Sequence, residues 1–328
     1  MRTRLLSAAL VSTVASLLAC GDSGSGPASG PPMHIIVLDG AGQTGVFGQP
    51  TPIVPSVLVT DVNNQPLRGV SVTFVVSPGG GSVGLATAKT DDRGSATPGE
   101  WKLGSSFATM ALTATVTGLP PVNFTAKAIA PDAGVLAFTL ADPAGDTLPT
   151  ASTTNPKAHD LLSMRGDFKR DSLILTLTFA EPVSATVLGS ATALAGFIEI
   201  DTDESTTTGS TPLSNSYGAS ATAGIDYIIS LAGNTPTTVR LIGTGGTSGT
   251  LNAAYTGNTL VIRIPMQALG NDDGRFTVVG VMGTIDRPTD VFPNSSALTV
   301  RPGSDIVALS ATRSGRHPMP FVPHAPRW

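Results

Sequence analysis

The stretch VTDVNNQPLRGVSVTFVVSPGGGSV, residues 59–83, shows the pattern that decides the fold. From Val70 to Val76 every second side chain is apolar, and Ser71 and Thr73 fall between them. Such alternation is typical of a β-strand with one face in a core and the other in water. Turn-forming residues stand on both sides, Asn-Asn-Gln-Pro before the run and Pro-Gly-Gly-Gly after it. The stretch therefore predicts one strand of a half-buried antiparallel sheet.

The same alternation recurs along the chain and predicts an all-β protein of two domains. Residues 110–117 and 124–128 repeat it, with turn clusters at 61–69, 78–82 and 91–94. About seven short strands within residues 34–130 are typical of a β-sandwich. Residues 173–179, 225–231 and 260–264 alternate in the same way and predict a second, larger sandwich of jelly-roll kind over residues 131–300.

Helices are expected to contribute little. Residues 267–269 predict a single helical turn, and no long amphipathic pattern occurs after residue 19. The two predicted sandwiches, in tandem, therefore exclude an α/β enzyme fold.

Three segments of the first domain carry a resemblance to a known family. Residues 59–83, TAKTDDRGSATPGEWKLG (87–104) and MALTATVTGL (110–119) resemble the bacterial Ig-like domain of the invasin and intimin type. In that family an Asp-x-x-x-x-Pro-x-x-Gly-Val turn, here Asp61 to Val70, leads into a Val-rich strand. A Thr-Asp-x-x-Gly turn, here Thr90 to Gly94, precedes the next strand. The resemblance implies a spacer or adhesion module without catalytic residues.

The second domain is distantly similar to exported β-sandwich modules of the DOMON-like and carbohydrate-binding kinds. The segments that carry this resemblance are ADPAGDT (141–147), DSLILTLTFAEPV (171–183), GFIEIDTDESTTTG (196–209), GIDYIISL (224–231) and VIRIPMQALGNDDGRFTVVGVMGT (261–284). The resemblance implies binding more than catalysis, and it identifies no ligand.

The N-terminal residues predict export and a lipid anchor. Arg2 and Arg4 precede an uncharged run at 5–18 that is short for a membrane span, which is typical of a signal peptide over residues 1–19. Leu-Leu-Ala-Cys at 17–20 resembles the bacterial lipobox, which implies lipidation of Cys20, the single cysteine of the chain. Because Gly21 and not Asp follows the cysteine, the resemblance implies the outer membrane.

Low-complexity segments flank the two domains. Residues 20–33 are rich in Gly, Ser and Pro and predict a flexible tether, so Ser23 of Gly-Asp-Ser-Gly is not expected to be a protease nucleophile. Residues 301–328 are rich in Pro and Arg and predict a disordered tail. His159 is expected to be solvated. With 19 basic and 23 acidic side chains, the chain shows no charge pattern for nucleic-acid binding.

One acidic segment is a candidate for metal binding. Asp201, Asp203 and Glu204 follow directly on an apolar run, and Asp226 interrupts another. Two interpretations stay open: a solvated acidic turn held by Asx hydrogen bonds, or a calcium site formed by Asp201, Asp203 and Asp226 if their strands are neighbours. Asp142 and Asp146 admit the same two interpretations.

These observations predict a membrane-anchored lipoprotein whose Ig-like spacer presents the second sandwich for non-catalytic binding to a glycan or a cell-surface protein. Tyr217 and Tyr255 are the aromatic residues expected to contact a glycan. Two alternatives remain: a carbohydrate-active hydrolase or its accessory subunit, using carboxylates such as Glu181 and Glu199, and a purely structural envelope lipoprotein.

Overall fold

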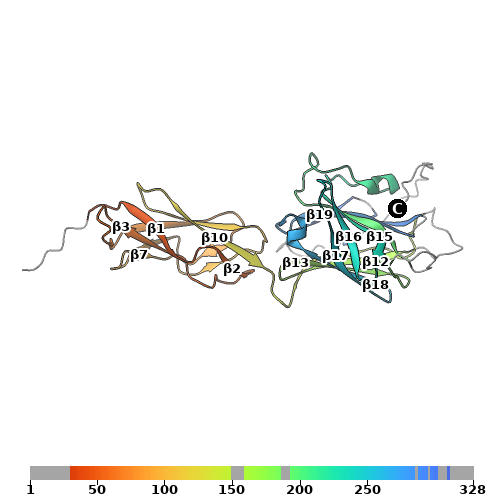
Figure 1. The fold of residues 1–328 in the computed structure, drawn as a ribbon, viewed down its shortest axis with the longest axis horizontal. Helices are drawn as coiled ribbons and strands as arrows, with labels where there is room; N and C mark the ends of the chain where they lie inside the picture. Colours follow the sequence, from red (N-terminus) through yellow and green to blue (C-terminus); the bar gives the residue numbers. More distant parts are fainter. Residues whose placement is uncertain are drawn as a thin grey trace, which may run out of the picture.

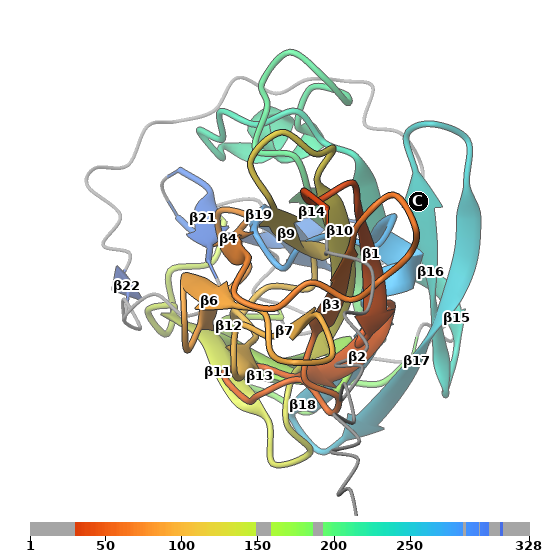
Figure 2. The same ribbon diagram turned by 90° about the vertical axis from the view of Figure 1, so that its left-hand side faces the viewer.

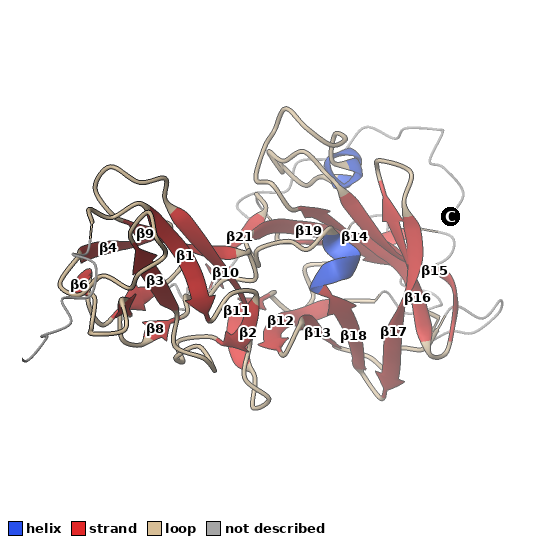
Figure 3. Ribbon diagram, turned by 60° about the vertical axis from the view of Figure 1, so that its left-hand side comes forward, coloured by secondary structure: helices blue, strands red, loops and turns tan. Residues whose placement is uncertain are grey.

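The computed structural model describes residues 30–148, 159–185, 193–284, 287–294, 296–301 and 309–310. The predicted signal peptide, Cys20, most of the tether and most of the tail lie outside the described residues. Within the described ranges, neither of the two short helices has the length and apolar character of a membrane span. The all-β prediction is confirmed, since strands form nearly all of the regular structure (Figure 3).

The first domain is a β-sandwich of two layers. A three-stranded sheet in the order β1-β3-β7 faces a five-stranded sheet in the order β2-β10-β9-β4-β6, in which β2 pairs with β10 in parallel. The strands are β1 (His34–Asp39), β2 (Gln43–Val46), β3 (Ser56–Thr60), β4 (Ser71–Val76), β5 (Ser82–Val83), β6 (Thr87–Lys89), β7 (Ser95–Ala96), β8 (Trp101–Lys102), β9 (Met110–Thr115) and β10 (Val122–Ile129).

The predicted alternation sets the faces of these strands. In β4, Ser71 and Thr73 are exposed, whereas Val72 and Phe74 are buried. The two buried side chains pack with Trp101 and Phe124 in one apolar core. The turn before β4 is held by Asp61, whose Oδ1 accepts hydrogen bonds from the N–H groups of Asn63 and Gln65. Local turn chemistry and strand period therefore agree on one register.

The second domain is built on one continuous twelve-stranded sheet. Its order is β20-β19-β14-β15-β16-β17-β18-β13-β12-β11-β22, with β21 also pairing β19. The elements are β11 (Val135–Ala141), β12 (Leu161–Lys169), β13 (Ser172–Phe179), β14 (Ala195–Asp201), η1 (Leu213–Tyr217), β15 (Tyr227–Thr235), β16 (Thr238–Gly243), β17 (Ser248–Thr256), β18 (Thr259–Pro265), η2 (Met266–Leu269), β19 (Phe276–Gly283), β20 (Pro288–Phe292), β21 (Leu298–Val300) and β22 (Leu309–Ser310).

This sheet curls on itself, so that its two halves form the facing layers of the sandwich (Figure 2). Phe138 of β11 meets Phe276 of β19 edge to face at 6.4 Å between ring centroids, although the two strands lie far apart in the sheet order. Both rings belong to one large apolar core. Alternation within single strands predicted the two layers, but it could not show that one sheet supplies both.

Aromatic side chains connect the two domains, which lie end to end along the long axis (Figure 1). Phe107 packs edge to face between Phe47 of the first domain and Phe168 of the second, at centroid distances of 4.9 and 5.1 Å. The Phe107 N–H donates to the Asp273 carbonyl at 3.1 Å, and the Ala130 N–H donates to the Arg170 carbonyl at 2.8 Å. The junction is thus packed and hydrogen-bonded, and not only a linker.

Candidate metal centre

Strand pairing brings together the three carboxylates that the sequence singled out. Asp201 is the last residue of β14, and Asp226 lies just before β15, its antiparallel neighbour. The Asp226 N–H donates to the Ile200 carbonyl at 2.9 Å, which fixes this register. One carboxylate oxygen from each of Asp201, Asp203 and Asp226 lies within 4.8 Å of the others. We call these three residues the loop carboxylate cluster.

Hydrogen bonds orient each member of the loop carboxylate cluster. Asp226 Oδ2 accepts from the N–H and the hydroxyl of Thr202, at 2.9 and 2.8 Å. The exposed Asp203 accepts from the Ser205 N–H at 2.9 Å and from the hydroxyl of Thr208. Asp201 Oδ2 accepts from the Gly224 N–H at 3.2 Å. The predicted Asx-type hydrogen bonds are therefore present, and they leave the buried Oδ1 of Asp201 without a partner.

That remaining oxygen is the strongest pointer to a ligand in the loop carboxylate cluster. Asp201 is 2% exposed, and its Oδ1 is buried without a hydrogen-bond partner. Burial, together with the nearby charges of Asp203 and Asp226, raises the pKa of Asp201. The Thr208 hydroxyl lowers the pKa of Asp203. Carboxylate oxygens at these separations fit a cation with Ca–O distances of about 2.3–2.6 Å.

Two further acidic residues lie close to the loop carboxylate cluster. Glu204 forms ion pairs with Arg275 and Arg301, with nitrogen–oxygen distances of 3.4 Å in both pairs, so its carboxylate faces the two guanidinium groups. Asp272 is 9% exposed, and its burial and the charges of Asp273, Asp226 and Glu204 raise its pKa to about 7. Sequence reasoning missed Asp272, because only the pairing of β14 with β19 brings residues 201 and 272 near one another.

Glu199, Tyr217 and Tyr255, which the sequence offered as candidate functional residues, make contacts inside the second domain. Glu199 is fully buried and accepts from the N–H groups of Leu213 and Ser214, at 2.6 and 3.1 Å, so it anchors η1 and does not face solvent. Tyr217 packs against Phe197 with ring centroids 6.1 Å apart. Tyr255 packs against the main core, and burial raises its pKa to about 12. These tyrosines do not form an exposed aromatic platform.

His159 corrects an expectation from the sequence. It is 2% exposed, its Nε2 lies 2.9 Å from the Ala193 carbonyl, and burial lowers its pKa. Its ring packs against Phe179 at 6.3 Å between centroids. The prediction of a solvated side chain is wrong, because the strand that follows carries His159 into the core.

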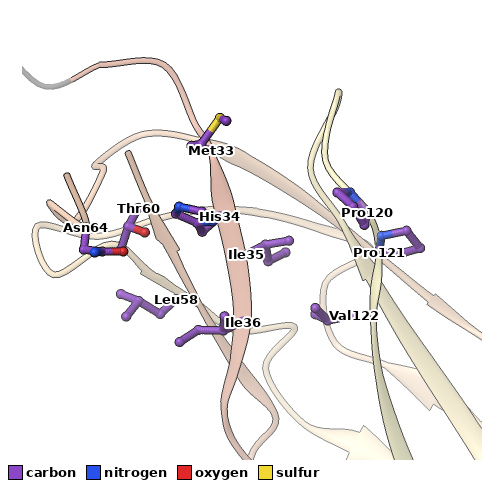
Figure 4. A pocket seen from close by; sticks show the side chains of 10 residues that line it. All are labelled: Met33, His34, Ile35, Ile36, Leu58, Thr60, Asn64, Pro120, Pro121 and Val122. Atoms are coloured by element: carbon purple, nitrogen blue, oxygen red, sulfur yellow. The ribbon is translucent and has the colours of Figure 1, made fainter. Parts of the chain in front are cut away.

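The first domain contains an apolar hollow of about 610 Å³ between the start of β1 and the start of β10 (Figure 4). Met33, Ile36, Leu58 and Pro121 contribute to its lining, and His34 is its one titratable side chain. The lining holds no pair of acid and base groups that would support catalysis.

Comparisons with known proteins give only distant similarity. No family model matches the chain, and no curated protein matches it. Among solved structures, the chain is similar to the D0-D1 domain of intimin, at 10% identity and a TM-score of 0.25, over 82% of this chain and 97% of that one. It is similar to the Yersinia pseudotuberculosis adhesin InvE at 13% identity and a TM-score of 0.27, over 81% of this chain and 58% of that one.

Domains 5–6 of the S-layer protein SbsC are similar at 12% identity and a TM-score of 0.21, over 83% of this chain and 99% of that one. TM-scores this low do not establish a common fold. The fold and the loop carboxylate cluster described above therefore rest on the strand pairing and the contacts of this chain alone.

Proposed function

We propose that this chain is an exported lipoprotein, anchored in the outer membrane through Cys20, whose Ig-like domain holds the second sandwich away from the membrane. The second sandwich binds a glycan or a cell-surface protein without catalysis. The observation that carries this proposal is the packed junction formed by Phe47, Phe107 and Phe168. The two domains lie end to end on either side of it (Figure 1). Relative motion is the default for two domains of one chain, and we expect these ring contacts and the backbone hydrogen bonds beside them to restrict it.

Calcium at the loop carboxylate cluster belongs to this proposal. The loop at 271–275 lies between the cluster and the first domain, because the carbonyl of Asp273 accepts the Phe107 N–H and the Ser106 hydroxyl. A cation bound by Asp201, Asp203 and Asp226 neutralises charge beside that loop. We therefore expect calcium to stabilise the second domain near the junction.

The calcium test compares melting of the full chain in millimolar calcium and in chelator. At free calcium a hundred times the dissociation constant, the wild type gains about 2.7 kcal/mol, and the Asp201→Asn, Asp203→Asn double variant gains less. Asp92→Asn, which changes an exposed carboxylate of the first domain, is the matched control. A midpoint that calcium leaves unchanged favours the solvated acidic turn.

Anchoring and binding are tested separately. A fatty-acid analogue is expected to label the wild type in cells and to leave Cys20→Ser unlabelled; equal labelling would contradict the anchor. The full chain carrying Cys20→Ser is then applied to a glycan array and to cell surfaces. Saturable binding without bond cleavage is expected. No binding on either surface would leave the structural envelope lipoprotein as the better description, and turnover of a glycan would favour the hydrolase.

A further inference from the structure

A second group of carboxylates joins the two ends of the curled sheet. Asp142 follows β11 directly, Asp160 directly precedes β12, and Asp290 lies in β20. In the sheet order β20 is at one end, while β11 and β12 are near the other. Asp146 lies in the turn after β11. We call Asp142, Asp146, Asp160 and Asp290 the edge carboxylate cluster.

Three members of the edge carboxylate cluster are almost completely buried, and Asp146 is half-buried. One carboxylate oxygen from each of Asp142, Asp146 and Asp290 lies within 4.8 Å of the others. Asp290 is 1% exposed, Asp142 6% and Asp160 7%. Asp160 lies outside this group of three; its Oδ2 accepts from the N–H of Gly145, the residue before Asp146, at 2.8 Å.

Direct hydrogen bonds cross between the two ends of the sheet at this point. Asp290 Oδ2 accepts from the Leu161 N–H at 2.8 Å, and the Thr289 hydroxyl donates to the His159 carbonyl at 2.7 Å. The Asn294 side-chain amide donates to Asp142 Oδ1 at 2.8 Å and to Asp146 Oδ2 at 2.6 Å. The edge carboxylate cluster therefore lies where the sheet closes.

Two buried oxygens of this cluster lack hydrogen-bond partners, Asp142 Oδ2 and Asp160 Oδ1. Among the described residues, the groups that donate to Asp142, Asp160 and Asp290 are neutral amides, namely Asn294 and the N–H groups of Gly145, Leu161 and Val291. Burying carboxylates beside one another is costly unless a bound cation, or a proton shared between neighbours such as Asp142 and Asp290, compensates them. Two unpartnered oxygens among crowded carboxylates therefore point to a ligand that is a cation.

We propose that a calcium ion binds the edge carboxylate cluster and holds the two ends of the curled sheet together. The available donors are all oxygens, which calcium prefers, and the three carboxylates of Asp142, Asp146 and Asp290 can supply up to six ligands if each binds through both oxygens. Rotation of the Asn294 amide by 180° would offer a carbonyl oxygen as well. The separations within 4.8 Å match two oxygens on opposite sides of an ion at about 2.4 Å.

This site is distinct from the loop carboxylate cluster. Asp201 pairs with Thr277 near the start of β19, whereas Asp290 pairs with Met282 near its end. Five residues along a strand correspond to roughly 16 Å. The inference also does not depend on the proposed ligand or on lipidation of Cys20.

The first test counts calcium ions bound per full chain by equilibrium dialysis after chelator treatment. The Asp142→Asn, Asp290→Asn double variant is expected to bind one ion fewer than the wild type, and Asp203→Asn is expected to keep the ion at the edge carboxylate cluster. We also expect calcium to raise the melting midpoint of the second domain in Asp203→Asn by roughly 5–10 °C. Equal ion counts for the wild type and the double variant would overturn the proposal.

A second measurement avoids dependence on a variant that fails to fold. Crystals of the wild-type chain grown with terbium, a calcium analogue, should show an anomalous peak between Asp142, Asp146 and Asp290. A peak at the loop carboxylate cluster alone would overturn the edge site and leave the proposed function intact. If no ion is found and the melting midpoint in calcium equals that in chelator, a proton shared between Asp142 and Asp290 explains the cluster instead.

Discussion

Asp272 illustrates how one buried carboxylate sets a pH dependence. Its Oδ1 accepts a 2.7 Å hydrogen bond from the Gly274 N–H, yet burial and neighbouring charges raise its pKa from 3.8 to about 7. The folded state therefore holds this proton more tightly than the unfolded state does. The associated stability is fully present below about pH 4 and is lost as the pH rises through about 7.

We predict that Asp272→Asn removes this part of the pH dependence. In chelator, the free energy of unfolding of the wild type should fall relative to that of the variant, by up to about 1.4 kcal/mol for each pH unit between 4 and 7. Urea unfolding of both full chains at pH 5, 6, 7 and 8 measures the difference. Asp92→Asn, with a side chain 76% exposed, should follow the wild type. Parallel curves for wild type and Asp272→Asn would contradict the prediction.

At this scale the sequence predicted part of each carboxylate cluster. Asp201 and Asp203 are close in sequence, and the condition placed on Asp226, that its strand be a neighbour, is met by the pairing of β14 with β15. Asp290 could not be joined to Asp142 in advance. They are 148 residues apart, and only the closure of the sheet brings them together. Whether either cluster binds calcium stays a prediction.

Two strands of the second domain place a phenylalanine over a glycine on the neighbouring strand. Phe138 of β11 pairs with Gly166 of β12, and a Cβ at Gly166 would lie 2.3 Å from the Phe138 ring. Phe292 of β20 covers Gly280 of β19 in the same way, with a Cβ 2.4 Å from its ring. In each pair the ring fills the space that a side chain would otherwise occupy.

We predict that Gly166→Ala displaces the Phe138 ring and destabilises the second domain by about 1–3 kcal/mol, as overpacking does in other cores. Gly249→Ala is the matched control, because Gly249 also lies in a strand and its added methyl group would meet no atom within 4 Å. Chemical denaturation of both variants measures the cost. Equal stability of the two would show that the Phe138 ring adapts freely.

The alternation of apolar and polar residues predicted the strands that have one face in water. It does not mark β14 and β19. Every residue of these two strands is buried, so neither shows alternation in exposure. Their second face is covered by the segment around η1, where Tyr217, Ala219 and Ala221 pack on Phe197 and Val279. A strand covered on both faces loses the period-two signal from which it would be predicted.

At the scale of the whole molecule, we predict that Phe107→Ala loosens the junction between the domains. The variant loses two edge-to-face ring pairs, together worth roughly 1–3 kcal/mol. Small-angle scattering of the full chain should then show a broader distribution of lengths, while circular dichroism shows both sandwiches intact. Val75→Ala, which truncates an exposed side chain of the first domain, should leave the scattering unchanged. Identical scattering for Phe107→Ala would show that the backbone hydrogen bonds suffice.

The sequence predicted that the second domain begins at residue 131, and the Gly134 N–H donates to the Pro131 carbonyl in a turn there. It could not predict the packing on either side of that turn. Phe107 is separated from Phe47 and Phe168 by about sixty residues in each direction, and no local period marks it. We predict that fragments 34–130 and 131–305 each fold independently. Circular dichroism and thermal melting of the two fragments test this, and unfolding of the isolated second fragment would show that it depends on the junction contacts.

The parallel pairing of β2 with β10 has a mechanical consequence. The chain enters the first domain at Met33, which lines the same hollow as Pro121 just before β10 (Figure 4). It leaves through Ala130, directly after the other end of β10. Tension between these points acts along β2 and β10, so the four register pairs from Ala126–Gln43 to Ile129–Val46 are sheared together and not unzipped singly. We therefore expect the first domain to resist extension between these points until all four pairs break together, which single-molecule pulling can measure.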